Sequence, residues 1–351
     1  MLVLLLAQSL ASAKTVRLIT IGPGDEFWSA FGHTALAIDQ DVYGFGYFSF
    51  EQEGLIKAFI DNQMYYEIGL SDLNEEVQLA QWQNRSFWVQ QLKLSDTQIQ
   101  EIEEHLIWHI LPENQSYHYD YFNNNCSTKI RDLLDQVWQG RLQRKFDQPT
   151  ALNHYQLTVP ANQQSWMNLG ISLVYGWSAY QPRTAWELMA YPEYLYAAME
   201  TSMQQQIDHT QLVYQQQSIT VWQMIWQTHG AILAILGFGL VLLAFGRTRR
   251  FMAWILVVSQ SLIGVTLGAF WMIGGYEMAS MNFNLLLFMP LAWLLIWWPV
   301  MKRILMFCYV LWSLIALYLG AWYLTPFLVL HVLAVWVLRQ PRPRSNIFQG
   351  A

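Results

Sequence analysis

Long apolar stretches fill the last third of the chain and are rare before it. They lie at about residues 225–246, 251–275, 284–300, 304–321 and 323–338, the last being short. A helix needs roughly 20 apolar residues to cross a bilayer. The pattern therefore predicts an all-α transmembrane domain of about five helices over residues 223–351.

In residues 14–222 the apolar residues do not form long stretches but recur at the spacing of strands and amphipathic helices. β-Branched residues at 15–21 predict a strand, and the runs 32–38 and 42–50 predict a hairpin joined at Asp39-Gln40-Asp41. Residues 51–112 have a mostly helical pattern. This mixture predicts an α+β domain over 14–222.

The first strand of the predicted hairpin carries a histidine among small side chains. Alternation places His33, Ala35 and Ala37 on one face and the larger apolar residues on the other. A two-residue turn would set His33 opposite Phe48, and a shift of one residue would set Tyr47 or Ser49 beside it. The small neighbours leave room for another group to approach the imidazole.

A cysteine stands at the head of a predicted amphipathic helix. After Cys126, apolar residues follow at helical spacing: Ile130, Leu133, Leu134, Val137 and Trp138. Asparagines at 123–125 favour a helix N-cap. The free N–H groups and the dipole of a first turn stabilise a thiolate and can bind an oxyanion, so we expect a nucleophile there. The alternative is a buried structural cysteine.

Charge is divided unevenly along the chain. Residues 14–222 hold 24 acidic and 11 basic residues, whereas residues 223–351 hold 8 basic residues and a single acidic one, Glu277. The acidic balance of the first domain excludes nucleic acid as a natural partner, because phosphate binding requires clustered Lys and Arg. A single thiol in an exported domain suggests that the thiol is used.

The ends of the chain and the basic loops predict its orientation. Residues 1–13 are apolar and end in Ala-Ser-Ala, which is typical of a secretory signal peptide, here without a charged start and cleaved near Lys14. Basic residues occupy alternate loops of the apolar region, at 247–250, 302–303 and 339–344. We therefore expect residues 14–222 outside the cytoplasm and the C-terminus inside it.

A cysteine nucleophile needs a base, and His33 is the best candidate. A Cys–His couple with the cysteine at a helix head is the working part of papain-like acyl chemistry, and the order of the two residues in the sequence is no obstacle. His105 and His109 are spaced for a metal, but Leu106 stands where a zinc-protease motif has glutamate. We expect no metal and no cofactor.

Three segments together resemble a known family. The runs GPGDEFWSAFGHTALAI, DVYGFGYFSF and YDYFNNNCSTKIRDLL are similar to the Lnb-type bacterial lipoprotein N-acyltransferase family, with weaker similarity at PRTAWELMAYPEYL and NFNLLLFMP. The resemblance implies a permuted papain-like periplasmic domain, of the NlpC and lecithin:retinol acyltransferase type, followed by a multi-span membrane region. Ser49 stands where the family pattern has an aspartate, and Met289 where it has an asparagine.

The resemblance also implies a reaction. Cys126 would take an acyl chain from a membrane phospholipid as a thioester and pass it to the α-amine of a diacylglyceryl-cysteine lipoprotein, with His33 moving the proton. Asn125 or Asn124 would assist the oxyanion, and Tyr47 or Ser49 would orient the imidazole. The implied location is the bacterial inner membrane.

Four further residues are candidates for substrate binding. Asn282 and Asn284, at the outer edge of the membrane region, would bind a lipid headgroup or else cap the third span or pair with neighbouring helices. Trp186 and Glu187 would line the acceptor path or else pack on a surface helix.

Two rival functions remain open at this point. One is an NlpC-type cell-wall peptidase or amidase, which five membrane spans do not favour because one anchor would suffice. The other is a non-catalytic, membrane-tethered binding module whose cysteine is incidental.

Overall fold

The structure of the chain is a computed structural model that describes residues 14–49, 51, 53–159, 164–246, 248–296 and 298–340. The predicted signal peptide therefore lies outside the described residues. The described chain divides into two compact units. The sheet unit comprises residues 14–55, 63–150 and 184–218, and the helical unit comprises 56–62, 151–183 and 219–340. Residues 151–183 thus join the helical unit, although the sequence placed the boundary at 222.

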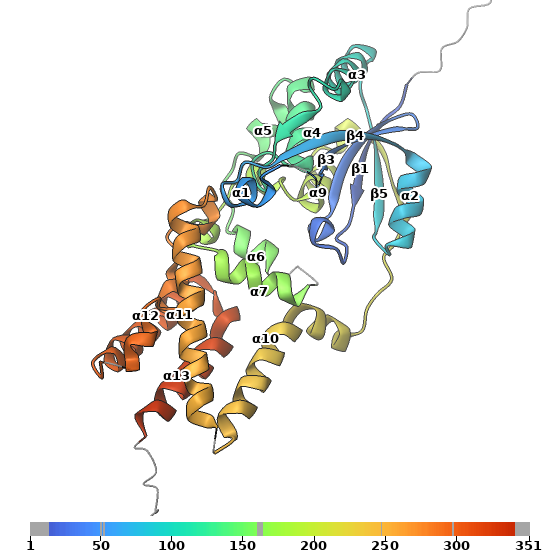
Figure 1. Cartoon of the computed structure of the whole chain (residues 1–351). Helices are drawn as coiled ribbons and strands as arrows, with labels where there is room; N and C mark the ends of the chain where they lie inside the picture. The colour runs from blue at the N-terminus through green and yellow to red at the C-terminus, as the bar shows by residue number, and fades with distance from the viewer. Residues whose placement is uncertain are drawn as a thin grey trace, which may run out of the picture. The chain divides into compact units, whose positions relative to one another are not determined.

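The described part of the sheet unit holds a seven-stranded antiparallel sheet in the order β6-β4-β3-β2-β1-β5-β7 (Figure 1). The strands are β1 Val16–Ile21, β2 His33–Ile38, β3 Asp41–Tyr47, β4 Tyr65–Asp72, β5 Phe87–Leu92, β6 Ser116–His118 and β7 Ile207–Tyr214. The helices are η1 Phe27–Ser29, α2 Leu73–Trp82, α3 Asp96–Ile110, α4 Cys126–Val137, α5 Arg141–Phe146, α8 Ala185–Leu188, α9 Pro192–Ser202 and η3 Gln204–Gln206. The α+β prediction is confirmed, but β4 and β5 lie where the sequence predicted mostly helix.

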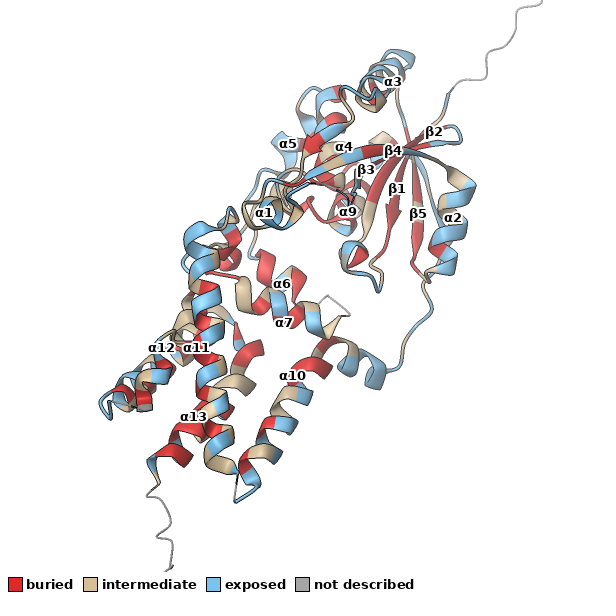
Figure 2. Ribbon diagram, viewed as in Figure 1, coloured by how far each residue is buried: buried red, intermediate tan, exposed pale blue. Residues whose placement is uncertain are grey.

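The two faces of the sheet have separate cores. On one face, residues such as Leu18 and Leu36 pack with apolar side chains of α3, α4 and α9. On the other face, Ala35 and Ala37 pack in a smaller cluster with Ala80 of α2. Figure 2 shows these buried positions on the strands. The alternation predicted for Ala35 and Ala37 against Leu36 and Ile38 is therefore correct.

The register of the hairpin differs from the predicted one. Ile38 pairs with Asp41 across a two-residue turn, and the pairing runs as far as Ala35 with Gly44. At its far end β3 bulges between Phe45 and Tyr47, where Gly46 has a φ of +104°. β3 ends three residues before the predicted end, and the bulge belongs to its pairing with β4. Because the two turn residues are Asp39 and Gln40, His33 lies next to Gly44 and not opposite Phe48.

The described part of the helical unit contains four helices whose length and composition suit a membrane span: α10 Val221–Ala244, α11 Arg249–Ile273, α12 Met301–Leu319, and Trp322–Arg339, which joins η7 Trp322–Leu324 to α13 Thr325–Arg339. Its shorter elements are α1 Leu55–Ile60, whose first residue belongs to the sheet unit, α6 His154–Thr158, α7 Ser165–Val174, η2 Trp177–Tyr180, η4 Glu277–Ala279, η5 Phe283–Leu286 and η6 Ala292–Ile296. The helices α10, α11 and α13 pack on one another (Figure 1).

The span predicted at 284–300 is wrong as a continuous helix. It consists of the short 3₁₀ helices η5 and η6 with Pro290 between them, and a proline interrupts a helix by removing an N–H donor and restricting the preceding residue. The segment runs antiparallel along α11. Gln260 Nε2 donates to Leu287 O at 2.7 Å, and Trp293 N donates to Ser261 Oγ at 3.0 Å.

Candidate active site

Cys126 is the first residue of α4, as the sequence predicted. Asn125 is its N-cap, and the Asn125 Oδ1 atom accepts a hydrogen bond from Thr128 N at 2.9 Å. In return, Asn125 N donates to Thr128 Oγ1 at 2.8 Å, which completes a capping box. The cap fixes the start of the helix, and with it the position of the sulfur.

Side chains of the asparagine run hold this turn in place. Asn125 Nδ2 donates to the carbonyl oxygens of Tyr121 and Ala190, both at 2.8 Å. Asn124 Nδ2 donates to His118 O at 2.6 Å. The amide groups of Asn125 and Asn124 are therefore engaged with the backbone, and backbone N–H groups at the head of α4 are better placed to serve an oxyanion.

The Cys126 thiol is partly buried, and opposing effects act on its acidity. Burial has the largest effect and raises the pKa of the thiol. Backbone N–H groups of Thr34, Ser127 and Cys126, together with the charge of Arg85, lower that pKa. The helix-head stabilisation expected from the sequence is present, but burial outweighs it. The resting sulfur is thus a thiol that needs a base, and the N–H group of Thr34 lies within reach of it.

His33 is the first residue of β2 and follows Gly32, whose φ is +84°. Burial, and to a lesser extent the charge of Arg85, lower the pKa of His33 to about 4. The imidazole is therefore neutral at pH 7, which is the form that accepts a proton.

Two glycines of β3 leave space for the candidate pair. A Cβ atom at position 44 would lie 3.1 Å from His33 Nε2, and a Cβ atom at position 46 would lie 3.7 Å from Cys126 Cβ. Because α4 packs on β2 and β3, Gly44 and Gly46 bring His33 and Cys126 to the same end of the hairpin. The Gly-Phe-Gly spacing in the sequence was the signal for this arrangement.

We expect Gly46→Ala to impair the site, although the substitution adds only one methyl group. Gly46 has a φ of +104°, where a side chain is strained, and the new Cβ atom would contact Cys126. The strain should cost about 1–3 kcal/mol of unfolding free energy. Relief of this strain by a backbone shift beside Cys126, and not the ordinary van der Waals contact of the new Cβ atom, should lower the thiol-dependent activity at least about tenfold. Gly54→Ala is the matched control, since Gly54 has a φ of +68° but nothing within 4 Å of a new Cβ atom. Equal activity loss in both variants would contradict the assignment.

Tyr47 and Ser49, the two candidates for orienting His33, have different surroundings. The ring of Tyr47 lies over Gly44 and Gly69, and a Cβ atom at position 44 would lie 3.6 Å from the Tyr47 hydroxyl oxygen. Ser71 hydrogen-bonds to Tyr47 and lowers its pKa, while burial, the larger effect, raises it. Ser49 is exposed beyond the end of β3, where its hydroxyl accepts a hydrogen bond from Glu51 N at 3.2 Å. Tyr47, and not Ser49, therefore shares the surroundings of the imidazole.

Trp186 and Glu187 serve the structure of the sheet unit. The Arg131 guanidinium carbon lies 3.9 Å from the centre of the Trp186 ring, and Arg131 Nη1 donates to Trp186 O at 2.9 Å. Glu187 Oε2 accepts a hydrogen bond from Thr184 N at 2.7 Å and so caps its own helix, α8. Ser127 Oγ donates to Met189 O at 2.7 Å, so this region also supports the head of α4.

Asn282 and Asn284 belong to the helical unit and are buried there. Asn282 Nδ2 donates to the carbonyl oxygens of Leu173 and Val174, both at 2.9 Å. Asn284 Nδ2 donates to Ser172 O at 2.8 Å, and its Oδ1 atom accepts from Trp312 Nε1 at 3.1 Å. They satisfy carbonyl groups at the end of α7 that have no partner within that helix. Both side-chain amides are therefore engaged with a neighbouring helix, which is the alternative to headgroup binding.

We expect Asn284→Ala to destabilise the protein without a specific effect on lipid binding. Loss of the buried amide should lower the unfolding free energy by about 2 kcal/mol, because it leaves buried carbonyl and indole groups unpaired. Thermal unfolding of the full chain in detergent, followed by circular dichroism, would measure this. Thr266→Ala, at an exposed hydroxyl bonded within its own helix, is the control. Unchanged stability with a raised KM for phospholipid would support headgroup binding instead.

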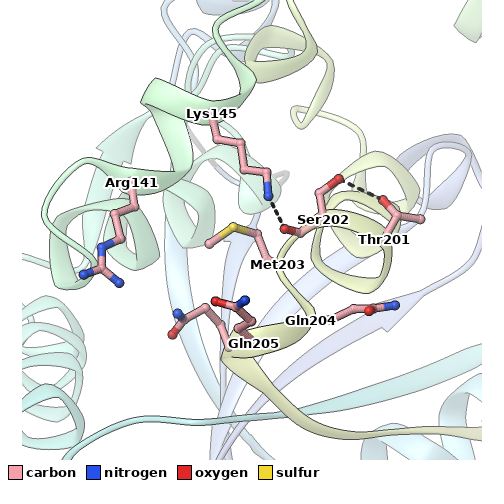
Figure 3. Close-up of a pocket in the computed structure, with 8 residues that line it drawn as sticks. Arg141, Lys145, Thr201, Ser202, Met203, Gln204 and Gln205 are labelled. Carbon is pink, nitrogen blue, oxygen red and sulfur yellow. Dashed lines mark hydrogen bonds between the residues drawn. The ribbon is translucent and has the colours of Figure 1, made fainter.

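Other clusters in the described residues do not form a second site. The rings of His105 and His109 meet edge to face with their centres 4.8 Å apart, and no group of three metal-ligating side chains occurs in the part of the chain that the structure describes. A surface hollow between Arg141, Lys145 and the end of α9 is shown in Figure 3. Lys145 Nζ donates there to Ser202 O, and the lining holds neither Cys126 nor His33.

Arg85 is the charged residue that the sequence analysis missed. It is buried, and its charge acts on both Cys126 and His33. Nothing in its local sequence distinguished it, since it precedes β5, far in sequence from both residues. The arrangement of a thiol, a neutral imidazole, backbone N–H groups and a nearby cation suits acyl transfer through a thioester.

Residues 6–159 match a family model described as the Lnb N-terminal periplasmic domain. The matched residues contain both His33 and Cys126. No curated protein and no solved structure matches the chain.

Proposed function

We propose that this chain, whose residues 6–159 match the Lnb N-terminal periplasmic domain, is an Lnb-family lipoprotein N-acyltransferase that works through a thioester on Cys126. The chain is a membrane protein with a periplasmic domain, since the family match accompanies four apolar helices in the described residues. The observation that carries the proposal is the position of Cys126 at the head of α4, beside the N–H group of Thr34, which is the residue that follows the neutral His33 in β2.

The first half of the reaction loads the enzyme. His33 accepts the proton of the Cys126 thiol as the sulfur attacks an ester carbonyl of a membrane phospholipid. Negative charge moves to the carbonyl oxygen, and N–H groups at the head of α4 stabilise it. The C–O bond then breaks, the departing lysophospholipid oxygen takes the proton from His33, and the acyl chain remains on sulfur.

The second half delivers the chain. The α-amine of a diacylglyceryl-cysteine lipoprotein attacks the thioester carbonyl, and His33 accepts a proton from the attacking nitrogen. The C–S bond breaks, the amide forms, and the proton on His33 returns to the Cys126 sulfur. Burial of the thiol protects the thioester from water.

The fold fits a permuted papain-like domain. In such a domain a helix that begins with the nucleophile packs on an antiparallel sheet, and the histidine comes from a strand. Here α4 packs on β2 and β3, and His33 opens β2. The histidine precedes the cysteine in the sequence, as a permuted member requires.

The helical unit supports an orientation in the inner membrane with the C-terminus in the cytoplasm. Arg250, at the start of α11, donates to Gln340 O at 2.6 Å, so the basic start of α11 and the end of α13 lie on one side. The interrupted segment from η5 to η6 packs along α11, with Leu285 near Gly268 and Trp293 bonded to Ser261, and in this orientation it would be a further passage between α11 and α12. Basic residues would then lie on the cytoplasmic side, as the positive-inside rule requires.

A two-step labelling experiment tests the function. Purified full-length protein is incubated with a phospholipid that carries a radiolabelled acyl chain, and protein-bound label is tested for release by neutral hydroxylamine, which cleaves thioesters. A diacylglyceryl-cysteine peptide is then added, and we expect the label to pass to its α-amine. Cleavage of muropeptides without acyl labelling would select the peptidase instead, and the absence of both would leave a binding module.

A further inference from the structure

Arg85 is a buried cation, and one nitrogen of its guanidinium group has no hydrogen-bond partner among the described residues. Its side chain is held by hydrogen bonds from Nε to Gly22 O at 2.9 Å and from Nη1 to Gln83 Oε1 at 3.0 Å. The residue is only 8% exposed, and its Nη2 atom is buried without a hydrogen-bond partner among the described residues. An unsatisfied charged donor is costly to bury, so its retention calls for an explanation.

The fold places Arg85 at the sheet end that carries His33. Ile21, the last residue of β1, pairs with His33 on one side and with Phe87 on the other. The next residue, Gly22, donates from its N–H group to Ser86 O at 2.8 Å and accepts from Arg85 Nε. The guanidinium is therefore tied to the strand end that adjoins the histidine.

The charges around Arg85 leave its positive charge available to the site. Glu76 of α2 is the acidic residue that acts on it, but the Glu76 carboxylate accepts a hydrogen bond from Ser71 Oγ at 2.7 Å. No ion pair joins Arg85 to a carboxylate in the part of the chain that the structure describes. The other titratable groups near the sulfur are the phenols of Tyr117 and Tyr119, whose pKa values burial raises, so that both are neutral.

We propose that Arg85 is a positioning residue of the thiol site: its cation, fixed by Gly22 and Gln83, stabilises the negative charge that the Cys126 sulfur acquires as its proton passes to His33. Arg85 is bonded to Gly22, which follows Ile21, the strand partner of His33, and the next residue along β2, Thr34, offers its N–H group to the sulfur. In keeping with this placement, the charge of Arg85 lowers the pKa of both Cys126 and His33. The catalytic meaning of this inference rests on the proposed function, but the charge effect can be tested without any lipid.

The alternative is that Arg85 merely ties the Gly22–Gly24 turn to β5. A Cβ atom at position 24 would lie 2.8 Å from Arg85 Cδ, so the side chain does pack tightly against this turn. A tie of this kind depends on the forked guanidinium, which lysine cannot reproduce. A stabilising charge depends on the cation, which lysine retains.

The experiment measures how the rate of Cys126 alkylation by iodoacetamide depends on pH. It uses the full chain in detergent with Cys308→Ala, so that Cys126 alone reports. We expect Arg85→Gln to raise the apparent pKa of Cys126 by about one unit, and Arg85→Lys to leave it within a few tenths. Arg17→Gln is the matched control, because Arg17 lies on β1 and bonds Asp39 O away from the thiol. It should leave the profile unchanged.

Three results would overturn the inference. They are a folded Arg85→Gln protein with an unchanged alkylation profile, a shift as large in Arg85→Lys as in Arg85→Gln, and an equal shift in Arg17→Gln. If Arg85→Gln does not fold, Arg85→Met takes its place: a rise of about one unit in the apparent pKa of Cys126 supports the charge effect, and an unchanged profile contradicts it. Because alkylation needs no lipid, failure of this inference is separable from failure of acyl transfer.

Discussion

Cys126→Ala should abolish both the thioester label and the transfer of the acyl chain to a lipoprotein amine. The variant removes the atom to which the acyl group is bonded, so no other side chain of the site can take over the first half-reaction. A loss of about 10⁴-fold or more in kcat is expected for a nucleophile of this kind. Mass spectrometry of a diacylglyceryl-cysteine peptide after incubation with enzyme and phospholipid would measure it.

Cys308→Ala is the matched control for that experiment. Cys308 is the other cysteine of the chain and lies in α12 of the helical unit. Its replacement should leave labelling and transfer unchanged. The Cys126→Ala protein should unfold within about 1 kcal/mol of the wild type, because little volume is removed from a partly buried position. Near-normal N-acylation by a folded Cys126→Ala protein would refute the mechanism.

The parts of the site that depend on local sequence could be predicted. Asparagine before Cys126 and the helical spacing of apolar residues after it are local signals, and the capped helix α4 follows them. Alternation in the first hairpin strand separated Leu36 from Ala35 correctly, because each face meets its own core. N–H groups at the head of α4 lower the pKa of Cys126, as the sequence led us to expect. Burial, the larger effect, raises that pKa and depends on tertiary packing.

Features that depend on distant residues or on backbone geometry could not be predicted. The hairpin turn falls at Asp39 and Gln40 and sets the register of β2 with β3, and the positive φ of Asp39 in this turn is permitted but not required by its side chain. Arg85 reaches the site through pairing of β1 with both β2 and β5, which no local pattern reveals. In the region 284–300, hydropathy alone indicated a span, whereas Pro290 and hydrogen bonds to α11 produce an interrupted segment.

Protonation of His33 should control both the activity and the stability of the protein in acid. Its pKa is lowered to about 4, mainly by burial, from an ordinary value of 6.5. The neutral base is therefore present from pH 7 down to about pH 5, and the rate of Cys126 acylation should hold over this range. It should fall below that, with an apparent pKa near 4 and not near 6.5.

The lowered pKa of His33 also determines the direction in which the unfolding free energy changes with pH. Between pH 6.5 and 4 the unfolded chain binds a proton at His33 that the folded protein does not, so the unfolding free energy falls as the pH falls. The stabilisation is complete above pH 6.5 and is lost progressively towards pH 4, a loss of about 3 kcal/mol.

His33→Gln tests both consequences in one protein. Glutamine cannot accept the thiol proton, so acylation should fall at least about 100-fold at pH 7, and the part of the acid destabilisation that belongs to His33 should vanish. His209→Gln, at an exposed histidine of β7, is the control and should keep the wild-type rate and the wild-type acid profile. Acylation at the wild-type rate in a folded His33→Gln protein would remove His33 as the base. If the unfolding free energy of that variant falls as steeply in acid as that of the wild type, the protonation of His33 is not the cause of the acid destabilisation.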